Sequence, residues 1–109
     1  MDDTTRLRFR EEMLAESRAD HVGLWEFLWE AQQLMPGADQ DSERAAALDL
    51  IRELLEAGQI TAGAPTEDAS GFVSWGLSVP ETMKRIEREL AELGRDPVGG
   101  EIVWFTAAD

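Results

Sequence analysis

Glycine and proline residues divide this chain and limit the length of any helix in it. Pro36-Gly37 ends one apolar stretch, Gly58 follows a second, and Gly94 ends a third. Glycine favours the left-handed position just past a helix, and proline interrupts helices. Between these stops the apolar residues recur at helical spacing, which predicts four helices. The predicted helices cover residues 4–18, about 21–35, 42–57 and 79–93.

The start of the last helix is the most strongly marked in the sequence. Ser78-Val79-Pro80-Glu81 has the serine–glutamate spacing of a capping box. Proline fits the first turn because its missing N–H would have no helical partner there. We expect the N-caps of the other three helices to be, in chain order, Asp3 or Thr4, Asp20, and Asp41 or Ser42.

Three short segments outside the helices have the composition of strands. Residues 59–63 and 72–75 flank the turn-rich stretch 64–71 and predict a hairpin. Residues 101–106 are rich in β-branched and aromatic side chains, so we expect them to pair beside the hairpin. The prediction is one α+β domain over residues 1–109, with three N-terminal helices, a β-hairpin, a fourth helix and a closing strand.

The junction between the third helix and the hairpin carries a resemblance to a known family. It reads Leu54-Leu55-Glu56-Ala57-Gly58-Gln59-Ile60 and leads from the helix directly into the first strand. This junction resembles the helix-to-wing junction of winged-helix domains, and the resemblance covers residues about 42–75. It implies a winged-helix-like fold with the last helix and strand as additions. It also implies that the helix over residues 42–57 is the one that would enter a DNA major groove.

The charge of the chain disfavours direct nucleic-acid binding. The formal net charge is −13. Residues 19–70 contain two arginines and eleven acidic residues, a net charge of −9. The outward face of the third helix carries Asp49, Glu53 and Glu56 beside Arg52. Phosphate contacts require lysine and arginine, so this surface favours a basic protein partner instead.

The second helix is apolar on most of its circumference. Glu26, Glu30 and Gln33 share one narrow sector, and Trp25 and Trp29 lie one turn apart. Two interpretations of the tryptophans stay open: they belong to the core, or they form an interface with a basic partner or a second copy of the chain. The candidate partner-binding residues are Trp25, Glu26, Trp29, Glu30, Asp49, Glu53 and Glu56.

The sequence contains no recognisable combination of catalytic residues. The chain has no cysteine and a single histidine, His21, which we interpret as a surface residue near the start of the second helix. Asp39, Asp41 and Glu43 alternate as calcium ligands can, but loop solvation and helix capping account for them. We expect no cofactor, no metal and no enzymatic activity.

The N-terminus lacks the pattern of a secretory signal, and no apolar run is long enough to span a membrane. Together with the absence of cysteine and the preference for arginine over lysine, this suggests a cytoplasmic bacterial protein. The favoured hypothesis is a small acidic interaction module, in its most specific form an immunity-type inhibitor of a basic toxin or nuclease. The alternatives are a winged-helix transcriptional regulator and an enzyme with a pocket around His21.

Overall fold

In residues 1–68 and 70–108, which the computed structural model describes, four helices pack against a four-stranded antiparallel sheet. The α+β class predicted from the sequence is confirmed. The elements in chain order are α1 (Asp3–Ala19), β1 (Val22–Gly23), α2 (Leu24–Leu34), α3 (Gln40–Glu56), β2 (Ile60–Pro65), β3 (Phe72–Ser74), α4 (Val79–Leu93) and β4 (Trp104–Ala107).

Helix α4 begins and ends where the sequence predicts. The Ser78 hydroxyl accepts a hydrogen bond from the Glu81 backbone N–H at 3.2 Å. At the other end Gly94 adopts the left-handed conformation with φ of 71°. Gly58 has φ of 69° after α3. The residues at the helix ends therefore set these boundaries, Ser78 through its hydroxyl and the two glycines through their left-handed backbone conformation.

The predicted N-caps of the first and third helices are wrong. Asp2 caps α1 by accepting the Thr5 N–H at 2.7 Å, and Asp39 caps α3 by accepting the Ser42 N–H at 2.7 Å. In both places the sequence offers several neighbouring side chains that can accept this hydrogen bond. The first of them in the chain is the one that caps.

The predicted start of the second helix is wrong for a tertiary reason. Helix α2 begins at Leu24, with Gly23 rather than Asp20 as its N-cap. The residues before it form β1, in which Val22 pairs with Phe105 of β4. The Glu26 carboxylate accepts the Gly23 backbone N–H at 2.8 Å, which completes the cap. His21 therefore precedes β1 and is not part of the helix.

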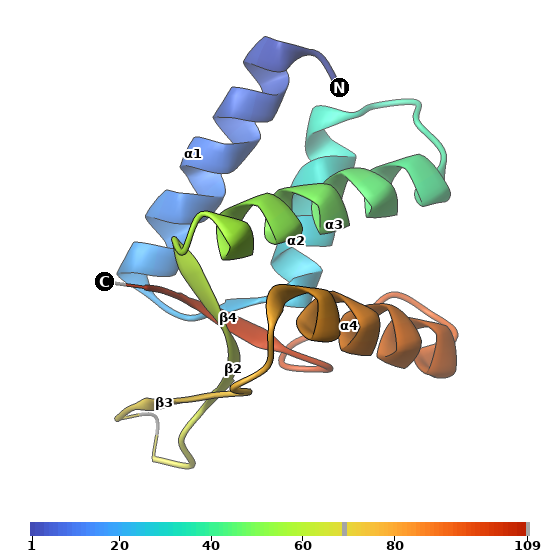
Figure 1. Cartoon of the computed structure of the whole chain (residues 1–109). Coiled ribbons are helices and arrows are strands. Elements are labelled where there is room, and N and C mark those ends of the chain that lie inside the picture. The colour runs from blue at the N-terminus through green and yellow to red at the C-terminus, as the bar shows by residue number, and fades with distance from the viewer. Residues whose placement is uncertain (69, 109) are drawn as a thin grey trace.

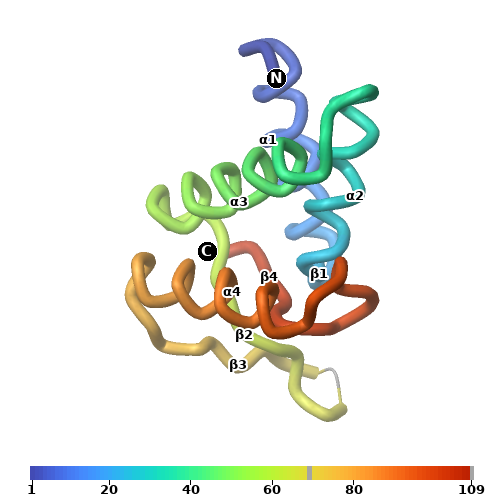
Figure 2. The backbone as a smooth tube through the Cα atoms, turned by 90° about the vertical axis from the view of Figure 1, so that its right-hand side faces the viewer, coloured from blue at the N-terminus to red at the C-terminus, as the bar shows by residue number. Residues whose placement is uncertain are grey.

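The sheet has the strand order β1-β4-β2-β3. The hairpin of β2 and β3 is confirmed, and β4 lies beside β2 as predicted, although β4 begins at Trp104 rather than residue 101. The end of β2 that leads into the hairpin loop points away from α1, α2 and α3 in both views (Figures 1 and 2). Gly63 lies in β2, one of the two inner strands, opposite Ser74 of β3 on one side and Trp104 of β4 on the other.

Three phenylalanines join the helices to the sheet. Phe27 of α2 makes edge-on contacts with Phe9 of α1, at 6.4 Å between ring centroids, and with Phe105 of β4, at 5.3 Å. All three side chains are buried. Such contacts stabilise the packing beyond the apolar area that they bury. They fix α1 and α2 against each other at the level of the sheet.

Helices α1 and α2 run antiparallel and lie side by side, with α3 packed across α2 (Figures 1 and 2). Leu24, Phe27, Leu28 and Ala31 are the buried residues of α2. The α2 side chains on the remaining circumference face the flank of α1 and the exterior. This part of the fold carries the two tryptophans whose placement the sequence leaves open.

Candidate functional site

A groove of about 600 Å³ runs between α1 and α2. Trp25 and Trp29 line it and remain 37% and 51% exposed. They lie one turn apart on α2, next to its buried face. The Trp25 ring also lies against Gly23, where an added Cβ would approach Trp25 Cδ1 to 2.8 Å. The structure therefore places both tryptophans at the surface, in one groove.

Four glutamates line the same groove. Glu12 and Glu16 come from α1, and Glu26 and Glu30 come from α2. Glu12 is paired with Arg8 at 3.0 Å. In the part of the chain that the structure describes, the other three make no ion pair. The groove thus combines exposed indole rings with carboxyl groups that make no ion pair.

Glu12 and Glu30 interact directly across the two helices. The hydrogen bond between their carboxyl groups, together with desolvation, raises the pKa of Glu30 to about 7. The same hydrogen bond, with help from Arg8, lowers the pKa of Glu12. Two carboxylates in contact cannot both ionise without repulsion, so they share one proton.

The Glu12–Glu30 pair predicts a pH dependence of stability. The folded-state pKa of Glu30 is raised above its unfolded value of about 4.5, so the folded protein binds more protons between pH 4.5 and 7. The free energy of unfolding should fall across that window as the pH rises. Because solvent screens the pair, we expect a loss of about 1 kcal/mol by pH 8.

Urea unfolding followed by tryptophan fluorescence, at a series of pH values, measures this loss. Glu30→Gln removes the titrating carboxyl and should abolish the decline between pH 4.5 and 7, whereas Glu12→Gln removes its partner and should reduce the decline. A decline that persists unchanged in both variants would show that another group causes it.

The acidic residues predicted on α3 lie outside the groove. Asp49 pairs with Arg52 at 3.4 Å. Glu53 accepts Arg6 at 3.2 Å and Arg10 at 2.7 Å, both from α1. The structure therefore separates the predicted site residues into two groups, and it uses Glu53 to join α1 to α3.

This bridging role predicts different effects for two glutamates on the same helix. Glu53→Gln should lower the free energy of unfolding by about 1 kcal/mol, because it weakens two ion pairs that are partly shielded from solvent. Glu56→Gln is the matched control, because Glu56 is exposed and makes no ion pair in the residues described. Equal stability of the two variants in urea would contradict the bridging role.

The structure does not bring His21 or the acidic residues near Asp39 together into a catalytic or metal-binding site. The His21 ring packs on Phe72 of β3 at 5.2 Å between centroids. Asp39 caps α3. Over residues 1–68 and 70–108, no group of three or more histidine, aspartate or glutamate side chains is arranged to hold a metal ion. None of the described helices combines the length and apolarity needed to cross a bilayer.

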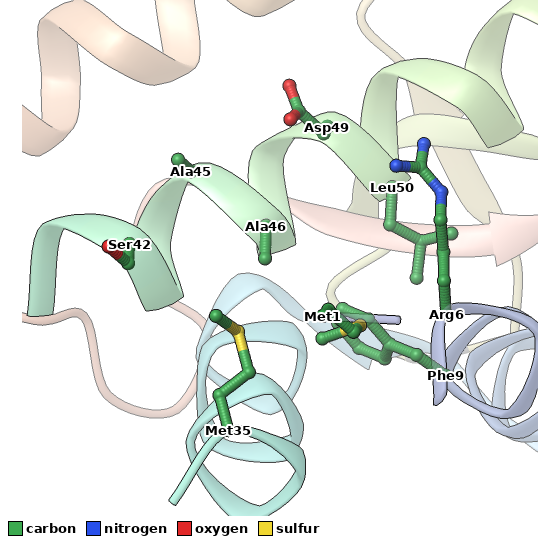
Figure 3. A pocket seen from close by; sticks show the side chains of 9 residues that line it. All are labelled: Met1, Arg6, Phe9, Met35, Ser42, Ala45, Ala46, Asp49 and Leu50. Atoms are coloured by element: carbon green, nitrogen blue, oxygen red, sulfur yellow. The ribbon is translucent and has the colours of Figure 1, made fainter. Parts of the chain in front are cut away.

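A second pocket, of about 310 Å³, lies where α1, the end of α2 and α3 meet (Figure 3). Met35 and Ala46 point into it, whereas Asp49 points away from Met35 on the outer side of α3 (Figure 3). Arg6, at its edge, is already paired with Glu53. Six of its nine lining residues are apolar and only Arg6 and Asp49 have charged side chains, so it lacks the concentration of carboxylates found in the α1–α2 groove.

Comparison of the chain with protein-family models, curated proteins and solved structures found no match. The assignment of the groove as the candidate site therefore depends only on the geometry of this protein. Sequence reasoning selected Trp25, Glu26, Trp29 and Glu30, which the structure brings together. It missed Glu12 and Glu16 of α1. Their spacing of one helical turn was visible in the sequence, but the docking of that face against α2 was not.

Proposed function

We propose that this protein is a non-catalytic interaction module that binds a basic segment of a partner protein in the α1–α2 groove. Its most specific form is an immunity-type inhibitor of a basic toxin or nuclease in the bacterial cytoplasm. One observation carries the proposal: Trp25 and Trp29 are exposed beside Glu16, Glu26 and Glu30, which make no ion pair within the described residues.

The chemistry of the groove favours a cationic peptide as its occupant. Tryptophan is enriched among the residues that dominate binding energy at protein interfaces. Its ring face also attracts arginine and lysine. The net charge of −13 would speed encounter with a basic partner. The same charge on a second copy of this chain would repel it, so we favour a heterologous partner over self-association.

The winged-helix resemblance gives a second candidate, a transcriptional regulator. We propose that the fold is a winged-helix variant in which β4 lies between β1 and β2, since α3 leads through Gly58 directly into the hairpin. However, the outward face of α3 presents Asp49 and Glu56, both exposed. Such a face repels phosphates. A gel shift with duplex DNA at low salt tests the regulator, and tight binding would favour it.

The interaction function can be tested with a short synthetic peptide in which arginines alternate with leucine and glycine. We call it the arginine peptide. The control is its citrulline counterpart, which keeps the side-chain shape but lacks the charge. The protein should bind the arginine peptide and not the control. Raising the salt from about 50 to about 300 mM should weaken binding at least tenfold.

Two variants with the same change in net charge locate the binding. At about pH 8, where Glu30 is about nine-tenths ionised, Glu16→Gln with Glu30→Gln removes nearly two charges from the groove, and Asp49→Asn with Glu56→Gln removes two from α3. Calorimetric titration should show weaker binding only for the groove variant. Equal weakening by both would mean that the total charge attracts the peptide without a site, and this outcome would overturn the proposal.

A further inference from the structure

We infer that one arginine side chain of the partner segment enters the α1–α2 groove, stacks on Trp25 and Trp29, and pairs with carboxylates of both helices. This inference rests on the proposed function and adds the identity of the cation and a pH control of the same site. It starts from the position of the carboxyl pair, because Glu12 and Glu30 line the groove together with both indole rings.

The side chains that line the groove favour a guanidinium over an ammonium group. A guanidinium is planar, so it stacks on an indole face while its N–H groups reach carboxylates in its own plane. The groove offers both kinds of surface at once, with the rings on α2 and carboxylates on both helices. A lysine ammonium is a compact charge that keeps its water shell more strongly. Arginine therefore fits more of the groove than lysine does.

The groups that face Glu30 determine what happens to the shared proton. From α1 these are Glu12 and Glu16, which disfavour ionisation of Glu30, and Arg8, which favours it. The net effect raises the pKa of Glu30 to about 7. A bound guanidinium adds a positive charge and favours the ionised form. Binding at about pH 6 must then release the Glu30 proton to the solvent, leaving two carboxylates on one guanidinium.

This exchange makes the affinity depend on pH. With a pKa of about 7, the free Glu30 carboxyl is about one-tenth ionised at pH 6 and about nine-tenths ionised at pH 8. If the complex requires the ionised form, the affinity for the arginine peptide should rise about tenfold over that interval. The arginine peptide is used with an acetylated N-terminus, and its guanidinium groups do not titrate in this range, so the change belongs to the protein.

Calorimetry tests the inference with the arginine peptide, its lysine counterpart and its citrulline counterpart. Titrations at about pH 6 in two buffers of different ionisation enthalpy report the protons released. We expect release of nearly one proton and about tenfold tighter binding at pH 8. The arginine peptide should also bind several times more tightly than the lysine peptide. The Glu30→Gln variant should bind without proton release, with an affinity that does not depend on pH.

The outcomes separate this inference from the proposed function. If the arginine and lysine peptides bind equally at the groove and no proton is released, the inference is wrong and the interaction function stands. If neither peptide binds, the proposed function fails with it. Proton release that persists in Glu30→Gln would place the titrating group elsewhere and would also overturn the inference.

Discussion

Gly63→Ala is expected to lower the free energy of unfolding by about 3 kcal/mol. A Cβ at this position would lie 2.0 Å from the Val73 carbonyl oxygen and 2.9 Å from Ser74 Cα. Both are backbone atoms of the neighbouring strand, so no side-chain rotation can relieve the overlap. Since β2 is bonded to β4 on its other side, the strands can separate only by losing pairing. Urea unfolding followed by tryptophan fluorescence measures the loss.

Gly71→Ala is the matched control at the far end of the same hairpin. Its added Cβ would meet Thr66 Cγ2 at 3.6 Å, an ordinary contact. Its effect should stay within about 0.5 kcal/mol. If Gly63→Ala is as stable as Gly71→Ala, the register of β2 against β3 described here is incorrect.

Replacing both groove tryptophans, Trp25→Ala with Trp29→Ala, should weaken binding of the arginine peptide about 100-fold or more. This corresponds to about 2.7 kcal/mol of binding free energy. The two rings are the largest apolar side chains that line the groove, and truncated aromatic anchors commonly cost this much. Trp29→Ala alone should give a smaller loss, because Trp25 remains.

The control for this experiment is Leu7→Ala. Leu7 is a large apolar residue of α1 that is 55% exposed and does not line the groove. Calorimetry should find unchanged affinity for this variant, and circular dichroism should find the double tryptophan variant folded. A folded double variant that binds as tightly as the natural protein would exclude the tryptophans from the interface.

The elements that could be predicted from the sequence are those whose ends are set by nearby side chains. Helix α4 is the best example, with Ser78 at one end and Gly94 at the other. Strand β1 could not be predicted, because two residues are too few to show a strand pattern. It exists because Val22 and Gly23 pair with residues of β4, which lie about 80 positions later in the chain.

In the candidate site, too, the features set by nearby residues could be predicted and those set by tertiary packing could not. The one-turn spacing of Trp25 and Trp29, and of Glu26 and Glu30, could be found from helical periodicity alone. That the tryptophans are exposed depends on how far α1 covers α2, which is a property of tertiary packing. From the sequence, Glu53 was predicted to be a free surface charge on the outward face of the third helix. Arg6 and Arg10 of α1 reach it only because the fold brings α1 to α3.

The most direct test of the groove is a nuclear magnetic resonance titration of ¹⁵N-labelled protein with the arginine peptide. The indole N–H signals of Trp25 and Trp29 should shift with the peptide. Those of Trp75, which is covered by Arg85 at 3.8 Å, and of Trp104 in β4 should not. Backbone shifts confined to α1 and α2 would support a binding groove. Shifts centred on Asp49 and Glu56 of α3, with both groove indoles unmoved, would contradict it.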